Sequence, residues 1–311
     1  MADSNLVTDK PLLGMALMTG FCLIAPLADG LAKLVGDQIP LLQLIAARFA
    51  LQAVCLVPFC LATGRSLRMA RREALLTGLR TALHILGIGM MFLSLRYLEL
   101  ADAIAIAFVM PFIMLLLGRF VLNEQVGQWR LGGCALGFVG TLMVVQPSFA
   151  EVGAPALLPV GVALVFALFM LVTRLIAKAL DPIAMQAVSG TMALGVLLPL
   201  MALSLGTGWA ELEPRPMSTS LWTIVIVMGV LGMIGHLMMS WALRYAPAAT
   251  LAPMQYLEIP FAALVGWVIF HDFPDGLALV GIGVVLAAGL FNVWREQQVQ
   301  AAQRSSATTT T

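Results

Sequence analysis

The sequence predicts an all-α polytopic membrane protein with ten transmembrane helices. Hydrophobic residues make up 61% of the chain and charged residues only 11%, whereas soluble domains carry about 25% charged residues. Apolar runs of about 20 residues, the length that spans a bilayer, recur along the whole chain. The connections between these runs are short, so no soluble domain is expected in any of them.

Ten segments have the length and apolarity of a membrane span. They cover residues 12–33, 41–62, 74–96, 101–121, 130–147, 156–178, 183–205, 220–243, 248–270 and 276–294. Residues 1–11 lack the basic region of a signal peptide, so the first span is expected to be retained. The polar residues 295–311 are expected to form a tail.

The distribution of Lys and Arg predicts the orientation of the spans. With the N-terminus inside, twelve Lys and Arg residues lie at inner helix ends, and three, Lys33, Arg96 and Arg215, lie at outer ends. Because inner loops of membrane proteins are enriched in Lys and Arg, residues 1–11 and the tail are both expected to be cytoplasmic.

An internal repeat with an offset of 148 to 149 residues connects the two halves of the chain. The Leu-Arg-Tyr motif at 95–97 recurs at 243–245, and the Pro-Phe pair at 111–112 recurs at 260–261. Since each half holds five spans, an odd number, the second half enters the membrane from the opposite side. Inverted repeats place a binding site near the midplane and permit alternating access by rocking of one repeat against the other.

These features resemble the drug/metabolite transporter superfamily, and specifically its EamA-type branch with ten helices. The resemblance rests on the five-plus-five arrangement, the basic connection between the second and third spans, and the Pro-Phe pairs of the fourth and ninth spans. It covers about Leu12 to Trp294. It implies two EamA-type repeats, 12–147 and 156–294, in the bacterial inner membrane, and a cavity lined by the first, third, fourth, sixth, eighth and ninth spans. Within the family the chain is similar to amino acid exporters, including the aromatic branch.

Glu258 is the main candidate for substrate binding, because it lies near the midplane of the ninth span. Gln255 lies on the same helix face, three residues earlier. Pro260 leaves the carbonyl of Tyr256 without its helical donor, and Pro111 has the same effect in the fourth span. The carboxylate is expected either to bind a substrate amine or a coupling proton, or to be a structural group tied to a neighbouring helix.

Other polar residues within the spans are further cavity candidates. His84 and Arg80 share one stripe of the third span; His84 is expected to bind a carboxylate, to relay a proton or to pack on a backbone carbonyl. Arg80 either faces the cavity or extends toward the cytoplasmic surface. His236, on the eighth span, is also expected in the cavity. Arg48 is expected to have a structural partner away from it.

Apolar candidates for contacting the body of the substrate complete the predicted cavity, with core packing as the alternative role. They are Trp241, Tyr256, Met110, Pro111, Met254 and Phe169. Asp29 and Lys33 lie four residues apart near the outer end of the first span, so they are expected to form an ion pair along the helix or a gate. Tyr97 and Arg244, from the repeated Leu-Arg-Tyr motif, are further gate candidates.

The sequence favours a carrier over an enzyme or a channel. The three histidines lie on different segments, without the cluster that a membrane enzyme needs, and the four cysteines have no metal-ligand spacing. The chain has no P-loop, so transport is expected to be driven by a proton, by exchange or by the substrate gradient. No cofactor, metal or catalytic residue is expected, and the dispersed basic residues argue against a nucleic acid partner.

The expected function is export of aromatic and other neutral amino acids and related small metabolites by alternating access. S-adenosylmethionine, vitamins such as riboflavin, nucleobases and cationic drugs are the alternative substrates. The expected partners are a zwitterionic or cationic small molecule and membrane lipid. The oligomeric state is left open.

Overall fold

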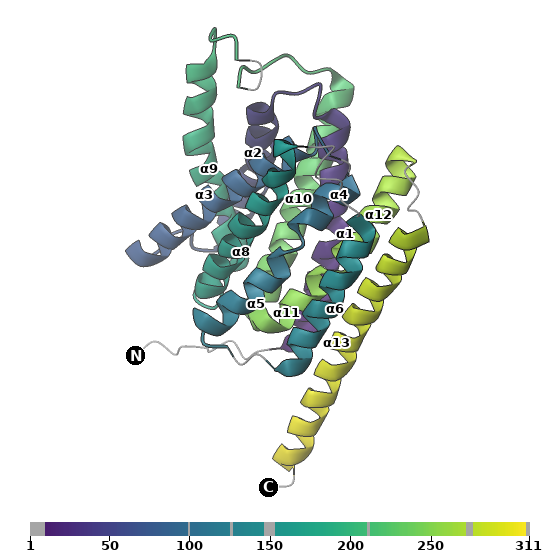
Figure 1. Cartoon of the computed structure of the whole chain (residues 1–311). Helices are drawn as coiled ribbons and strands as arrows, with labels where there is room; N and C mark the ends of the chain where they lie inside the picture. The colour runs from purple at the N-terminus through teal and green to yellow at the C-terminus, as the bar shows by residue number, and fades with distance from the viewer. Residues whose placement is uncertain are drawn as a thin grey trace.

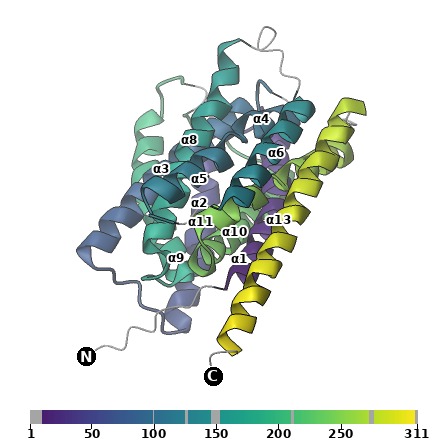
Figure 2. The ribbon, with the colours of Figure 1, turned by 60° about the horizontal axis from the view of Figure 1, so that its bottom comes forward.

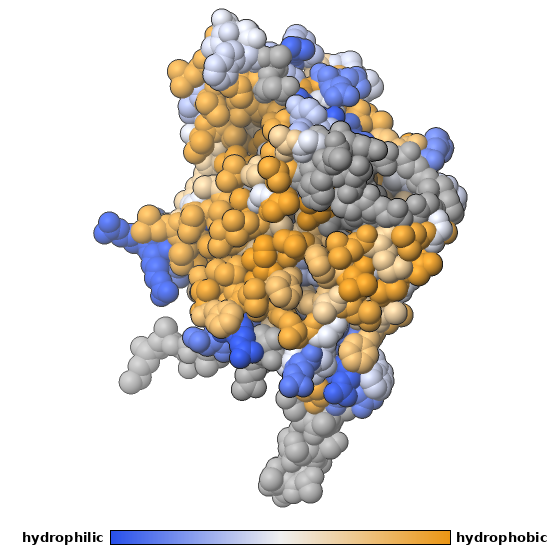
Figure 3. Space-filling model, viewed as in Figure 1, coloured by the Kyte–Doolittle hydropathy of each residue, from blue (hydrophilic) through white to orange (hydrophobic). Residues whose placement is uncertain are grey.

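The computed structural model describes residues 10–98, 100–124, 127–145, 153–209, 212–271 and 276–308, and these residues form helices without any strand. Within them, eight segments are long and apolar enough to cross a membrane. Apolar side chains cover the middle of the molecule, and hydrophilic ones gather toward its two ends (Figure 3). The expectation of an all-helical protein with several membrane spans is therefore confirmed.

The helices follow the expected spans closely. They are α1 (Pro11–Val35), α2 (Leu41–Ala62), α3 (Arg71–Ser94), α4 (Leu100–Ala107), α5 (Met110–Phe120), α6 (Gln128–Val145), α8 (Leu157–Ala177), α9 (Pro182–Ser204), α10 (Thr219–Tyr245), α11 (Ala248–Gln255), α12 (Glu258–Val265), the short π-helix η2 (Gly266–Phe270) and α13 (Gly276–Thr308). A 3-10 turn, η1 (Ala154–Ala156), precedes α8. Helix α1 begins and α13 ends at the same end of the bundle, which we call the terminal end (Figure 1).

Two of the expected spans are interrupted at equivalent positions. A turn at residues 108–109 separates α4 from α5, and a turn at residues 256–257 separates α11 from α12. The two turns are 148 residues apart, the offset of the sequence repeat. Pro111 and Pro260 follow these turns, and a proline removes a helical N–H and clashes with the preceding turn of helix. The prolines therefore favour a break near the centre of both helices.

The two halves of the chain interleave in one bundle. Helix α1 packs on α10, α2 on α9, α3 on α8, and α6 on α13, and Figure 2 shows the last pair side by side. Small residues permit these close contacts. A Cβ at Gly190 of α9 would lie 3.1 Å from the backbone nitrogen of Ala53 in α2, and one at Gly140 of α6 would lie 2.9 Å from the carbonyl oxygen of Gly281 in α13. Each pair consists of one helix from each half. The interface between the two halves therefore lies inside the bundle.

Candidate functional site

A cavity lies between the two halves, in the part of the bundle that is remote from the terminal end. Its empty space is about 760 Å³, including the part that opens to the outside. Helix α1 lines it with residues of its second half, from Phe21 to Asp29, and α3 does so from Ile88 to Phe92. Both helices begin at the terminal end (Figure 1). The cavity therefore reaches from the far end of the bundle to about its middle.

Most of the cavity lining is apolar. The rings of Phe21, Phe92, Phe108 and Phe166 contribute to it, as does Met110. Aromatic rings and flexible methionines accept apolar groups of varied shape. This part of the lining suits the aromatic or aliphatic body of a small organic solute.

Two carboxylates form an acidic side of the cavity. Glu258 begins α12 directly after the break in the helix, where the unpaired N–H groups of a helix favour negative charge. Asp29 projects from α1 and interacts electrostatically with Glu258. Neither carboxylate forms a hydrogen bond or an ion pair with any of the described residues, although both line the cavity. The oxygens of both carboxylates are therefore available for hydrogen bonds to a cationic group.

Arg48 of α2 and His236 of α10 form a basic side of the same cavity. Nδ1 of His236 lies 3.1 Å from Nη2 of Arg48 and 3.0 Å from the carbonyl oxygen of Gly232; it accepts from the arginine in one tautomer or donates to the carbonyl in the other. A Cβ at Gly232 would lie only 2.6 Å from Cζ of Arg48, so this glycine lets the guanidinium lie against α10. Arg48 also interacts electrostatically with Asp29, which lines the same cavity.

The expectation for Arg48 was wrong, because Arg48 lines the cavity rather than lying away from it. Its position was inferred from the helices that line the cavity in the family. A buried arginine in a membrane span is itself a strong functional signal, and that rule alone would have identified it.

His84 lies on the terminal side of the cavity and is not among the residues that line it. Its ring lies 4.3 Å from that of His236, 4.6 Å from that of Phe169 and 5.1 Å from that of Phe49, measured between centroids. The ring is fully buried, and neither nitrogen has a partner among the described residues. The expected bond from His84 to a backbone carbonyl is therefore not formed. Phe169 lies behind the cavity with it.

Arg80 lies one helical turn further toward the terminal end than His84. It is fully buried, so of the two expectations for Arg80 the extension to the cytoplasmic surface was wrong. Its side chain donates hydrogen bonds to Thr173, Ser189, Gln186 and Ser240. It does not line the cavity in this conformation, and a role in binding substrate stays a prediction.

The remaining cavity candidates are divided between the lining and the surrounding core. Met110 lines the cavity, whereas Gln255, Met254, Tyr256 and Pro111 are buried outside its lining. The ring of Tyr256 lies 5.6 Å from that of Phe108, which does line it. Trp241 lies away from the lining and stacks on Tyr245 at 5.7 Å. Contact with substrate stays a prediction for each of these residues.

The expected gate residues do not lie together. Lys33 donates to the carbonyl oxygens of Leu98, at 2.6 Å, and Leu95, and it forms no ion pair with Asp29. The expected pairing along α1 was wrong, because Asp29 points to the cavity while Lys33 closes the turn after α3. Tyr97 is exposed in that turn.

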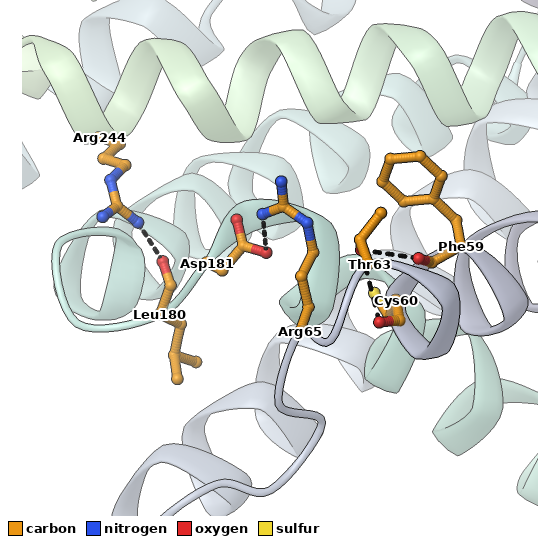
Figure 4. A network of polar contacts seen from close by, with 7 residues as sticks. All are labelled: Phe59, Cys60, Thr63, Arg65, Leu180, Asp181 and Arg244. Atoms are coloured by element: carbon orange, nitrogen blue, oxygen red, sulfur yellow. Dashed lines mark hydrogen bonds and ion pairs between the residues drawn. The ribbon is translucent and has the colours of Figure 1, made fainter.

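Arg244, the fourth gate candidate, lies at the terminal end and donates to the carbonyl oxygen of Leu180 (Figure 4). In the same view Nη1 of Arg65 pairs with Oδ2 of Asp181 at 2.7 Å. Arg65 follows α2 and Asp181 precedes α9, so this pair joins the two halves at the terminal end.

A second group of contacts closes the terminal end. The carboxylate of Glu124 accepts the backbone N–H groups of Ala248 and Ala249 at 3.1 and 2.9 Å, and it pairs with Nε of Arg174 at 3.3 Å. Arg174 also donates to the carbonyl oxygen of Leu243 at 2.6 Å. We call Glu124, Arg174 and the first turn of α11 the terminal clamp.

Comparison with known proteins agrees with this architecture. The EamA-like transporter family model matches residues 12–146 and 154–294. A crystal structure with 18% identity superposes with a TM-score of 0.69 over 90% of this chain and 95% of its own, which shows a shared fold.

Curated relatives are named as transporters of two kinds of solute. A riboflavin transporter of Rhizobium johnstonii is 30% identical over 220 residues, which is 70% of each chain. An S-adenosylmethionine uptake transporter of Rickettsia felis is 25% identical over 89% of this chain and 91% of its own. A riboflavin transporter of Vibrio cholerae is 22% identical over 94% and 97%. The chain therefore belongs to the EamA-like transporter family, and it is a multi-pass transporter of the bacterial inner membrane rather than an enzyme.

Proposed function

We propose that this protein is a secondary transporter of small solutes that carry an α-amino acid headgroup, amino acids with aromatic or other neutral side chains among them. The observation that carries the proposal is the arrangement of charge in the cavity. Two carboxylates, Asp29 and Glu258, which form no hydrogen bond or ion pair with the described residues, share an otherwise apolar cavity with Arg48 and His236. An α-ammonium group fits the acidic side, and an α-carboxylate fits the guanidinium.

The charge balance of the cavity favours an amine-bearing solute over a neutral one. Two carboxylates and one guanidinium leave an excess of negative charge, which a cationic ligand offsets in a cavity of low dielectric. The ammonium and carboxylate of a zwitterionic ligand pair separately with the acidic and basic sides. S-adenosylmethionine, the solute named for the Rickettsia relatives, carries an amino acid headgroup and a sulfonium cation. It belongs to the same chemical class as the amino acids expected from the sequence.

The proposed mechanism is alternating access between two inverted five-helix repeats, residues 12–147 and 156–294, with ten membrane spans and both termini in the cytoplasm. The matching breaks in α4–α5 and α11–α12 support the repeat, and the distribution of Lys and Arg supports the orientation. In this orientation the cavity opens to the outside of the cell, while the terminal clamp closes the cytoplasmic side.

Competition for the same carboxylates gives a physical basis for export. Glu258 and Asp29 hold either a proton or a substrate amine, and a carrier that alternates between these two ligands exchanges one for the other. An inward proton gradient then drives the solute outward. Residues 1–11 and 295–311 are the cytoplasmic segments in this scheme, and the partners are the solute and membrane lipid.

Flux from preloaded proteoliposomes tests the proposal. Vesicles are loaded with radiolabelled phenylalanine, S-adenosylmethionine or riboflavin, with and without a pH gradient. We expect saturable efflux of a solute with an amino acid headgroup, accelerated by an opposing proton gradient. If correctly inserted protein moved none of the headgroup solutes, the proposed substrate class would be wrong.

Riboflavin transport is the second candidate function. Relatives from Rhizobium and Vibrio carry that name, and the phenylalanine rings of the cavity suit a flat aromatic ligand. The same flux experiment separates the two candidates, because riboflavin has no ammonium group. Its transport should survive Glu258→Gln, whereas transport of a headgroup solute should not.

A further inference from the structure

Arg80 is a buried cation without a counter-ion among the described residues. Its Nε donates to Thr173 at 2.8 Å, Nη1 to Ser189 at 2.9 Å, and Nη2 to Gln186 at 3.1 Å and Ser240 at 3.4 Å. These four partners come from α8, α9 and α10, and all are neutral. The guanidinium also lies 4.5 Å from the centre of the Phe169 ring. Each of its three nitrogens has a hydrogen-bond partner, but its charge is not balanced by any carboxylate of the described chain.

A buried charge of this kind is costly to keep. Hydrogen bonds to hydroxyl and amide groups replace the contacts with water, but they do not cancel the charge. Neutral side chains could hold the same helices together at lower cost, so charged groups within the membrane usually mark the path of an ion or substrate. The charge of Arg80 therefore needs an explanation that packing alone does not supply.

The position of Arg80 connects it to the cavity. Thr77, Arg80, Thr81 and His84 form one buried stripe of α3, and the next turns of the same face line the cavity at Ile88. The rings of His84 and His236, which contact each other at an interplanar angle of 33°, separate Arg80 from the cavity in this conformation. A cavity that opened at the terminal end would extend along this stripe.

Further polar groups around Arg80 await a ligand. Both ring nitrogens of His84, Nε2 of His236 and Nε2 of Gln186 are buried and have no hydrogen-bond partner among the described residues. His84 and Gln186 are both fully buried. Because buried polar atoms are normally paired, these groups indicate that another molecule occupies this region in a different conformation.

We propose that Arg80 forms a second carboxylate-binding site on the transport path. In the conformation that is open at the terminal end, Arg80 with Ser189 and Thr173 holds the solute carboxylate that Arg48 holds in the conformation described above. This inference rests on the proposed function, since it requires a solute with a carboxylate. Arg48 then binds the carboxylate when the carrier is open at the cavity side, and Arg80 binds it when the carrier is open at the terminal end.

Charge-selective thiol labelling tests whether Arg80 forms an anion-binding site, without any knowledge of the substrate. Thr77 lies one turn from Arg80 toward the terminal end, so Thr77→Cys is introduced into a variant that lacks the four native cysteines. The protein is held in lipid nanodiscs, where both ends are accessible, and treated with an anionic or a cationic methanethiosulfonate reagent. We expect the anionic reagent to react about tenfold faster, because an unbalanced guanidinium attracts it.

The control variants distinguish the effect of Arg80 on the labelling rates from the effect of the other charges at the terminal end. Arg80→Gln should abolish the preference, whereas Arg65→Gln, which removes a charge at the terminal surface, should preserve it. Equal rates for the two reagents, an unchanged preference in Arg80→Gln, or no labelling at all would overturn the proposal. Size-exclusion profiles show whether each variant is folded.

The KM for transport, measured separately with substrate at each side of the membrane, is a second readout. Substitution of a purely structural arginine would not change KM at one side only. For a transported headgroup solute, Arg80→Lys should raise KM about tenfold at the terminal side only, because lysine lacks the bidentate fork of arginine. Arg48→Lys should raise KM at the cavity side only. Equal changes at both sides would assign Arg80 a structural role. If the wild type moved no headgroup solute, the proposed function would fail, and the labelling result would still decide whether Arg80 forms an accessible anion site.

Discussion

The acidic residues at the two ends of the bundle differ in how they are satisfied. At the terminal end, Glu124 uses both carboxylate oxygens, on two backbone N–H groups and on Arg174. In the cavity, Glu258 and Asp29 have no such partner among the described residues, although the same apolar bundle surrounds them. A satisfied carboxylate holds helices together, whereas an unsatisfied one is available to a ligand. The comparison distinguishes structural from functional charges in this protein.

Substitution of the unsatisfied acid should have the largest effect on transport. Glu258→Gln keeps the shape of the side chain but removes the charge that binds the substrate amine. A desolvated charge pair contributes about 2–5 kcal/mol, so the transport rate at low substrate concentration should fall at least about thirtyfold. The initial rate in proteoliposomes measures this effect.

The matched variant Asp29→Asn should also reduce transport, and both proteins should insert and elute normally. Normal transport by Glu258→Gln would remove Glu258 from the mechanism. It would also show that the absence of a partner does not identify a functional carboxylate here.

Substitution of the satisfied acid should affect stability more than binding. Glu124→Gln weakens the terminal clamp, because it removes the ion pair with Arg174 and the charge that the N-terminus of α11 favours. The loss of a charged hydrogen-bond partner costs about 1–3 kcal/mol, so the melting temperature should fall by a few degrees, as a thermal-shift assay would show.

A matched control for Glu124→Gln is Glu213→Gln, in which the lost contact is a single bond to the backbone N–H of Gly206 in an exposed turn. It should change the melting temperature less than Glu124→Gln does. The opposite order would contradict a clamp at the terminal end.

The smallest effect is expected for the exposed ion pair at the same end. The side chains of Arg65 and Asp181 are 36% and 29% exposed, and a pair that water screens contributes at most about 1 kcal/mol. Arg65→Gln should therefore leave the melting temperature and the transport rate close to those of the wild type. A loss as large as that of Glu124→Gln would show that burial does not set the strength of these contacts.

The sequence predicted several residues of the site but not which of them lie together. Glu258 was identified because a carboxylate near the midplane of a span is rare and costly, and Asp29 was identified through its position near a helix end. The predicted ion pair between Asp29 and Lys33 was wrong, because it was inferred from spacing along one helix. In the folded chain Asp29 lines the cavity with Arg48 and interacts with it electrostatically. Periodicity describes neighbours on one helix and contains no information about which other helix packs beside it.

The sequence by itself determined the fold class. Lipid cannot satisfy backbone polar groups, so long apolar runs must form helices. Proline weakens such helices, but Pro26 and Pro58 lie inside the unbroken helices α1 and α2, so the tertiary structure decided which prolines accompany a break. Tertiary packing decided which charges meet. Arg48 and His236 are 188 residues apart, and they touch because Gly232 lets α2 approach α10. Such a contact depends on the fit of two helix surfaces, a property that neither segment possesses alone.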